Sequence, residues 1–285
     1  MPRSQTRSLT PVFLLAPMNR SGTKLFKSVL LAHPRITQGF SLEDYSLAYS
    51  DTLIQFADAI SRHWARTQEE KALHRDRLID GIGPFLLDFF TEGADLKTAD
   101  HLLLTTPRPW GISNVFRLFP SARLIVLIRN GGDTVESARN SFPGPSFGQW
   151  VREWDKGAQE VLRFANAERE SGGRRWQAVS FEKLVRDPES VGRTTFGFLG
   201  LDGDAVDWDA VREGPVRGSS EHGGPAHNRP KTADFNPVGR SSGWSWLERA
   251  QFRRRAEATD KALKQLLDRA VDRTPPAPAR HEPRR

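Results

Sequence analysis

The stretch PVFLLAPMNRSGTKLFKSVLLA, residues 11–32, decides the fold. Residues 11–16 are a continuous apolar run, which is typical of a buried strand. Residues 23–32 repeat apolar side chains at i, i+4 spacing, which is typical of an amphipathic helix. In an open parallel sheet, the turn between such a strand and such a helix lies at the carboxyl edge of the strands, where ligands bind. The stretch therefore predicts an α/β fold with a candidate binding turn at residues 16–24.

Short apolar runs alternate with helical patterns along the rest of the chain. Further strands are predicted at residues 35–39, 101–105, 123–129 and 176–181. Helices are predicted at residues 43–66, 68–90, 113–119, 135–140, 147–170, 182–199 and 244–270. The run at 123–129 is β-branched and continuous, so we expect it to be central and buried on both faces. The alternation predicts a P-loop-like three-layer fold, in which helices flank a central parallel β-sheet.

A single domain is expected over residues 11–273. Residues 1–10 are polar and predict a flexible N-terminus. Residues 274–285 combine proline with charge and predict a disordered basic tail. Residues 201–242 are rich in Gly, Pro, Asp and His and lack a periodic pattern. Long segments of that kind inside a compact domain are usually functional or mobile.

The composition excludes several classes of protein. The 285 residues contain no cysteine, which rules out a disulfide scaffold, a thiolate nucleophile and cysteine-based metal sites. No apolar run reaches the length of a membrane span, and the N-terminus lacks a secretory pattern, so we expect a cytoplasmic protein. Lysine and arginine number 42 against 35 acidic residues, a formal net charge of +7. That balance suits an anionic ligand or, alternatively, a merely solvated arginine-rich surface.

The turn after the first strand has the composition of an anion-binding site. Gly22 lets the backbone approach a ligand closely, and the helix that follows begins with unpaired amides and the positive end of its dipole. Ser21 and Thr23 add hydroxyl groups, while Arg20 and Lys24 add positive charge. The residue order differs from the Walker A loop, in which the lysine precedes Ser or Thr. The alternative is an ordinary helix start with Ser21 as its N-cap.

A second candidate anion site follows the central strand, which ends at Arg129. Ser137 is predicted in the first or second turn of the next helix, facing back toward the strand end. A guanidinium and a hydroxyl in that position can bind one phosphate together, and Arg139 adds charge nearby. The alternative is a surface ion pair between Arg129 and Asp133.

Together these two segments resemble the sulfotransferases that use 3′-phosphoadenosine-5′-phosphosulfate (PAPS). The first resembles the family's 5′-phosphosulfate loop, in the order Pro17, Arg20-Ser21-Gly22-Thr23, His33-Pro34. The second resembles the 3′-phosphate motif through Arg129 and Ser137. Later segments that fit in order are residues 105–107, 179–188, 198–200 and 216–220. The resemblance covers residues 11–250 and is greatest to the Arg-Ser-Gly-Thr branch, which includes bacterial, tyrosylprotein and carbohydrate enzymes.

The resemblance implies an enzyme that moves a sulfo group from PAPS to a hydroxyl or amine of an acceptor. It implies that Arg20 binds the 5′-phosphosulfate and assists catalysis, together with Ser21, Gly22, Thr23 and Lys24. Arg129 and Ser137 are then expected to hold the 3′-phosphate. The segment implied to close over the nucleotide consists of Arg217, Gly218, Ser219 and Ser220.

The general base implied by the resemblance is Glu43, with Asp44 and His33 as competitors. The alternative for Glu43 is a first-turn acid of the helix predicted after Ser41. Where many family members have a lysine that helps the leaving group, this chain has Thr105. Three residues are candidates for the role of that lysine: Lys24, Lys27 and Arg108.

Two other functions stay open at this point: a P-loop-like kinase, and a non-catalytic module that binds an anion such as 3′,5′-ADP (PAP). No metal is expected, because arginine and backbone amides can supply the positive charge for sulfo transfer. We expect a small-molecule or carbohydrate acceptor and no nucleic-acid partner. The sequence identifies neither the acceptor nor the oligomeric state.

Overall fold

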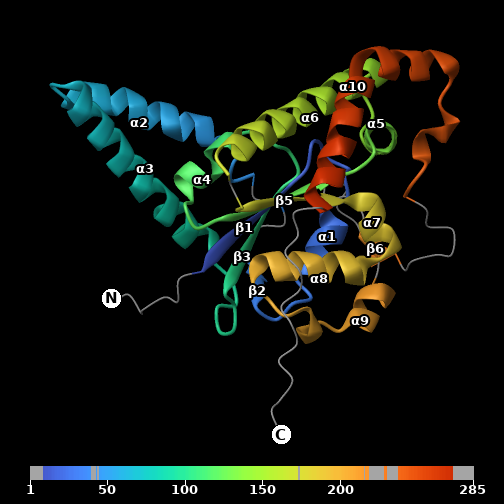
Figure 1. The fold of residues 1–285 in the computed structure, drawn as a ribbon, viewed down its shortest axis with the longest axis horizontal. Helices are drawn as coiled ribbons and strands as arrows, with labels where there is room; N and C mark the ends of the chain where they lie inside the picture. Colours follow the sequence, from blue (N-terminus) through green and yellow to red (C-terminus); the bar gives the residue numbers. More distant parts are fainter. Residues whose placement is uncertain are drawn as a thin grey trace, which may run out of the picture.

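A computed structural model describes residues 9–39, 43, 45–172, 174–214, 216–217, 228–229 and 237–271. Its centre is a five-stranded parallel sheet with the strand order β2-β3-β1-β4-β5 (Figure 1). The strands are β1 (Thr10–Leu15), β2 (Ile36–Gln38), β3 (His101–Thr106), β4 (Arg123–Ile128) and β5 (Trp176–Ser180). The two-residue strands β6 (Val216–Arg217) and β7 (Asn228–Arg229) form an antiparallel pair. The predicted α/β fold with a parallel sheet is confirmed, and β1 begins one residue before its predicted start.

The helices surround this sheet. They are α1 (Thr23–Leu30), α2 (Ser50–Trp64), α3 (Gln68–Phe90), α4 (Val115–Leu118), α5 (Gly131–Ser141), α6 (Phe147–Glu170), α7 (Phe181–Arg186), α8 (Pro188–Leu199), α9 (Trp208–Glu213) and α10 (Trp246–Val271). Short 3-10 helices are η1 (Ile112–Asn114), η2 (Gly203–Ala205) and η4 (Arg240–Gly243). None of the helices in the described part of the chain is long and apolar enough to cross a membrane.

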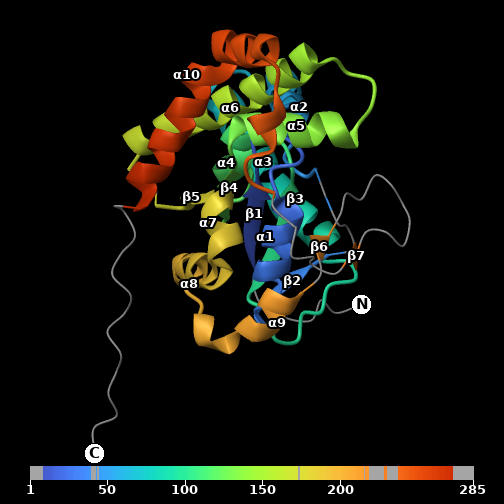
Figure 2. The same cartoon turned by 90° about the vertical axis from the view of Figure 1, so that its right-hand side faces the viewer.

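Strand side chains alternate between two hydrophobic cores, one on each face of the sheet. Helices cover both of these faces (Figure 2). Phe13 and Leu15 of β1 face the core that α2 to α6 and α10 complete. Val12 and Leu14 face the other core, which α1, α7, α8 and α9 complete. Because β1 and β4 are covered on both faces, their sequences are continuous apolar runs instead of alternating ones. All pairs in the sheet are parallel, so every strand ends at the same edge.

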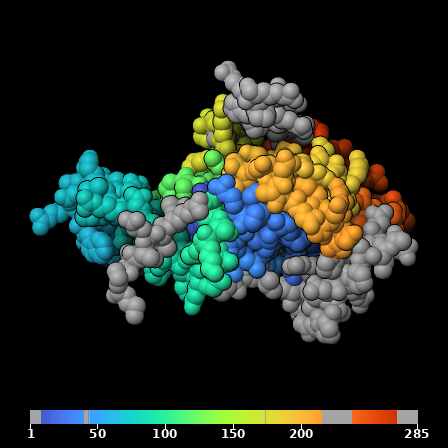
Figure 3. All heavy atoms as spheres, turned by 90° about the horizontal axis from the view of Figure 1, so that it is seen from below, coloured from blue at the N-terminus to red at the C-terminus, as the bar shows by residue number. Residues whose placement is uncertain are grey.

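Helices α2 and α3 form a hairpin that projects from the body of the molecule (Figure 3). Several large side chains on it are exposed: Tyr49, Phe56, Trp64, Leu73, Phe85 and Phe89. The predicted start of α2 at residue 43 is wrong, because the helix begins at Ser50. The carbonyl of Leu47 packs so closely on Gly111 that a Cβ there would lie 1.9 Å from it. Residues 45–49 lie in turns instead, and Tyr45 has a left-handed φ of 51, which an α-helix does not contain.

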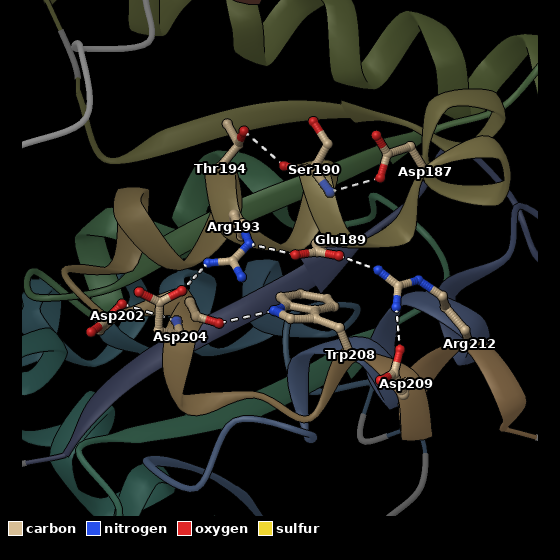
Figure 4. Close-up of polar contacts among 11 residues, drawn as sticks. Asp187, Glu189, Ser190, Arg193, Thr194, Asp202, Asp204, Trp208, Asp209 and Arg212 are labelled. Carbon is tan, nitrogen blue, oxygen red and sulfur yellow. Dashed lines mark hydrogen bonds and ion pairs between the residues drawn. The ribbon is translucent and has the colours of Figure 1, made fainter.

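A polar cluster joins α8, η2 and α9 on the outer surface (Figure 4). Arg193 lies between Glu189, at 2.9 Å, and Asp204, at 2.5 Å. Arg212 of α9 pairs with the same Glu189 and with Asp209. Exposed ion pairs of this kind contribute little to stability individually. What holds α9 is Trp208, which is buried against Phe196 and whose indole donates to the carbonyl of Gly203 at 3.0 Å. This helix lies in a segment where the sequence predicted no regular structure.

Candidate functional site

The two predicted anion sites meet at the carboxyl edge of the sheet. Strands β1 and β4 are neighbours, so the turns that follow them lie next to each other. The Nε of Arg20 donates to the Oγ of Ser137 at 3.4 Å. The Nη1 of Arg129 donates to the carbonyl of Arg20 at 2.6 Å. The predicted residues Arg20, Arg129 and Ser137 therefore form one connected cluster.

The turn after β1 has an unusual backbone. Arg20 and Gly22 both lie in the left-handed region, at φ 72 and φ 96, and such values are uncommon for a residue other than glycine. Gly22 is the N-cap of α1 and, as a glycine, supplies no side-chain cap to this helix. The alternative with Ser21 as N-cap is wrong, because the buried Ser21 hydroxyl donates to the carbonyl of Met18 at 2.7 Å. What Ser21 can offer to an anion is therefore its backbone amide, because its hydroxyl proton is engaged.

A phenyl ring connects the two turns. A Cβ on Gly22 would lie 2.2 Å from the ring of Phe181, so only glycine fits there. The guanidinium of Arg129 lies over the same ring, 4.7 Å from its centroid, in a cation–π contact. No sequence pattern signals the stacking, because Gly22, Arg129 and Phe181 come from three separate segments.

Arg129 is the most deeply buried charge of the cluster, at 4% exposure. Its Nη2 donates to the carbonyl of Pro237 at 2.5 Å. Burial lowers the pKa of the Arg129 guanidinium to about 10, and the nearby Asp133 carboxylate opposes this shift, so the group stays cationic at neutral pH. A guanidinium has five N–H groups. Two of them bind the carbonyls of Arg20 and Pro237, and the buried Nε makes no hydrogen bond to the described residues.

The alternative of a surface ion pair between Arg129 and Asp133 is wrong. Both side chains are buried, and the Asp133 carboxylate accepts hydrogen bonds from other groups. Its Oδ2 accepts from the amide of Gly239 at 2.6 Å. Its Oδ1 accepts from the amide and the hydroxyl of Ser241, at 3.0 and 2.9 Å. The guanidinium of Arg129 therefore donates to two backbone carbonyls and can donate its other N–H groups to a ligand.

The N-terminus of α5 is occupied by the protein itself. The amide of Asn130 donates to Glu182 at 2.8 Å, and the amide of Gly131 donates to Asp260 at 2.9 Å. The side chain of Asn130 accepts from the amide of Asp133 at 3.0 Å, which makes Asn130 the N-cap. The helix therefore begins at Gly131, earlier than the predicted residue 135. Ser137 lies in its second turn, as predicted.

The candidate bases lie at different edges of the sheet. Glu43 follows the carboxyl end of β2 and accepts from the Tyr45 hydroxyl at 3.4 Å. It is not in the first turn of α2, because that helix begins at Ser50. Asp44 lies outside the described residues. His33 precedes β2 and so lies at the amino edge, away from Arg20. Its Nδ1 accepts from the Arg35 amide, its Nε2 contacts the carbonyl of Asp202, and burial lowers its pKa.

Of the remaining predicted residues, some are described by the structure and others lie outside the described ranges. Thr105 is buried at the end of β3, beside Leu14. Arg108 pairs with Glu153 of α6 at 3.5 Å, and Arg139 pairs with Glu136 and Glu248 instead of adding charge at Ser137. Of the predicted closing segment, Arg217 lies in β6. The others lie outside the described residues: Gly218, Ser219 and Ser220.

Comparison with known proteins agrees with this arrangement. A sequence model described as "Sulfotransferase family" matches residues 11–205, which contain the first turn, Arg129 and Ser137. The chain therefore belongs to the sulfotransferase family. The sulfotransferase domain of the Synechococcus PCC 7002 olefin synthase has the same fold, with a TM-score of 0.52 at 18% identity over 89% of this chain and 96% of that domain.

Among curated relatives, the protein-tyrosine sulfotransferase of Drosophila melanogaster is 25% identical over 66% of this chain and 38% of its own length. Protein-tyrosine sulfotransferase 1 of Danio rerio is 24% identical over 67% of this chain and 53% of its own length. The chain thus spans about half or less of the length of these two relatives.

Proposed function

We propose that this protein is a PAPS-dependent sulfotransferase that transfers a sulfo group to a hydroxyl or amine. The observation that carries the proposal is the connected cluster of Arg20, Ser137 and Arg129 at the ends of β1 and β4. Two guanidinium groups, a hydroxyl and an uncapped helix N-terminus together suit a ligand with more than one anionic group. Family membership supports the same reaction.

The chemistry of these residues fits the donor. The uncapped start of α1, with Gly22 and Thr23, offers backbone amides to the 5′-phosphosulfate, and Arg20 and Lys24 add charge. Arg129 keeps three of its five N–H groups without a protein acceptor among the described residues, and with Ser137 it would hold the 3′-phosphate. Arg217, Gly218, Ser219 and Ser220 stay the proposed closing segment.

Sulfo transfer resembles phosphoryl transfer, in which the protein mainly positions the reactants and stabilises the developing charge. When bound, PAPS supplies the sulfo group and a phosphate as leaving group. Arg20 and the amides at the start of α1 would neutralise the charge that grows on that phosphate. Glu43 would take the proton of the acceptor as the new sulfur–oxygen or sulfur–nitrogen bond forms. The assignment of Glu43 is supported by the sheet topology, since β2, which precedes it, ends at the same edge as β1.

The proposed acceptor is a small molecule or a carbohydrate. The names of the two curated relatives add a second candidate, a tyrosine hydroxyl of a protein. Both acceptors present a hydroxyl, so the same base and the same donor site serve either one. We propose that the protein is cytoplasmic. We also propose that it acts without a nucleic-acid partner.

Calorimetry with 3′,5′-ADP and 5′-ADP tests the donor site. The expected result is tighter binding of 3′,5′-ADP by about tenfold or more, since one charged phosphate contact is worth roughly that much. Equal affinity would contradict the 3′-phosphate site and favour an ordinary adenine-nucleotide enzyme such as a kinase. Incubation with radiolabelled PAPS and separate pools of metabolites, glycans and peptides then tests transfer. A protein that binds 3′,5′-ADP but labels no pool is a non-catalytic binding module.

A further inference from the structure

Asp133 has a buried carboxylate to which the proposed reaction gives no role. It lies in the first turn of α5 at 2% exposure. Three groups donate to it: the amides of Gly239 and Ser241, and the Ser241 hydroxyl. Hydrogen bonds to an ionised acceptor are stronger than neutral ones. Asp133 therefore fixes residues 239–241 firmly on the start of α5.

The packing around this attachment is close. A Cβ on Gly132 would lie 2.9 Å from the side chain of Ser241, so the two segments are in contact. Gly239 lies in the left-handed region at φ 81 and is the N-cap of η4. The chain therefore turns sharply at the residue whose amide Asp133 holds, and the direction of the residues just before it depends on that hydrogen bond.

Those preceding residues include Pro237, whose carbonyl accepts from Arg129. Three groups hold the guanidinium of Arg129: this carbonyl, the carbonyl of Arg20 and the ring of Phe181. The Pro237 carbonyl is the one that the Asp133 attachment places. A side chain that was held by only two of the three groups would keep more rotational freedom and lose more of it on binding.

Asp133 forms no ion pair with Arg129, and this leaves N–H groups of the guanidinium available to a ligand. A direct ion pair would occupy the N–H groups that a phosphate needs. Because the carboxylate accepts from Gly239 and Ser241 instead, it stays near the buried cation without blocking it. The nearby charge also favours the protonated guanidinium, since Asp133 counteracts part of the lowering of the Arg129 pKa by burial.

We propose that Asp133 is a positioning residue for the donor's 3′-phosphate: it ties residues 239–241 to α5 and thereby holds Arg129 in its binding orientation. This inference rests on the proposed function, because it takes Arg129 as the 3′-phosphate ligand. It adds a residue that touches neither donor nor acceptor and that acts through Pro237 and Arg129.

The test is the ratio of the dissociation constants of 5′-ADP and 3′,5′-ADP, measured by calorimetry for the full chain. Asp133→Asn keeps the size of the side chain but turns one acceptor into a donor that faces a backbone amide. The ratio is expected to fall by about tenfold, the equivalent of one charged hydrogen-bonding contact, while the affinity for 5′-ADP changes by less than twofold. A general loss of structure would instead weaken both ligands equally.

Glu136→Gln is the matched control. Glu136 lies one turn further along α5 and also binds the segment after η4, since it accepts from the Trp244 indole at 2.8 Å. Its loss is expected to lower the thermal midpoint and leave the ratio unchanged. Ser241→Ala removes one of the three hydrogen bonds to Asp133 and keeps the test usable should Asp133→Asn not fold; a reduction of about twofold to threefold is expected.

The two proposals fail in different ways. A wild-type protein that prefers 3′,5′-ADP, with Asp133→Asn and Ser241→Ala retaining that preference, overturns the role of Asp133 alone. A wild-type protein without any preference overturns the 3′-phosphate site, and the role of Asp133 falls with it. An equal loss in Glu136→Gln also overturns the role of Asp133, because any weakening of the α5 attachment would then suffice.

Discussion

The turns after β1 and β4 have the same topology but differ in the groups that cap the helix following each turn. Each follows a buried parallel strand and leads into a helix at the same edge of the sheet. At the first turn, α1 starts without a side-chain cap, and the backbone passes through the left-handed region at Arg20 and Gly22. At the second turn, Glu182, Asp260 and the Asn130 side chain accept from the first amides of α5.

The difference shows that a strand–turn–helix unit can present an anion site in two ways. The first turn offers backbone amides, because its N-cap, Gly22, has no side chain to accept from them. At the second turn the amides of Asn130, Gly131 and Asp133 donate to protein side chains. What this turn offers is two side chains, the guanidinium of Arg129 and the hydroxyl of Ser137. A doubly charged donor that spans both turns would then be held by amides at one end and by side chains at the other.

The largest effect is expected from removal of the Arg20 side chain, which lies in the first turn and contacts Ser137 of the helix after the second turn. Arg20→Ala should lower the rate of sulfo transfer about a thousandfold, because a preorganised cation at a developing charge is worth two to three orders of magnitude or more. The thermal midpoint should change little. Radiolabel transfer from PAPS measures the effect, and Arg139→Ala is the control, since that arginine pairs with Glu136 and Glu248. An active Arg20→Ala enzyme would remove Arg20 from the mechanism.

Replacing the glycine of the first turn should have the next largest effect. Gly22→Ala places a methyl group 2.2 Å from the Phe181 ring at a φ of 96. The cost is expected to be about 2–4 kcal/mol in the free energy of unfolding, from left-handed strain and overpacking together. Urea unfolding measures it. At Gly200, φ is 75 and no atom of the described residues lies within 4 Å of an added Cβ, so Gly200→Ala isolates the strain at about 1 kcal/mol. Equal losses in the two variants would show that the Phe181 contact is unimportant.

A smaller effect is expected at the second turn. Asp260→Asn weakens the charged hydrogen bond to the Gly131 amide and the contact with Lys264, at a cost of about 1–2 kcal/mol in unfolding free energy. Asp268→Asn is the control, because it is exposed on the same helix. Binding of 5′-ADP should stay within twofold in both variants. Weaker 5′-ADP binding in Asp260→Asn alone would mean that the two turns are coupled.

The smallest effect is expected at the amino edge of the sheet, remote from both turns. Burial lowers the pKa values of His33 and His101 below their usual value, so the unfolded chain binds more protons near pH 6. These groups therefore contribute stability that is complete above about pH 6.5 and is lost as the pH falls below it. Urea unfolding between pH 7.5 and 5.5 checks the sign. A double His33→Gln and His101→Gln variant should show a shallower decline, and an unchanged decline would assign it to other groups.

Local signals predicted the elements well where the chain itself supplies the end signals. Helix α6 has the predicted bounds, and its start has a capping box formed by Ser146 and Gln149. The prediction failed for α2, because Tyr45 has a left-handed φ of 51 and the helix begins only at Ser50. Both candidate anion turns could be found from composition. Their direct contact through Arg20 and Ser137 could not, because it depends on β1 and β4 being neighbours in the sheet.

The sequence by itself determined the strand–turn–helix units and the residue types in each turn, because apolar periodicity and the position of glycine are local properties. Only the tertiary structure decided which amides stay available. Glu182 and Asp260 lie 52 and 129 residues from their amide partners at the start of α5, and nothing local brings them there. Sheet order and helix packing bring Glu182 and Asp260 to the second turn, so that side chains are what this turn offers to a ligand. At the first turn, the ring of Phe181 leaves room only for glycine at residue 22, so that backbone amides are offered there.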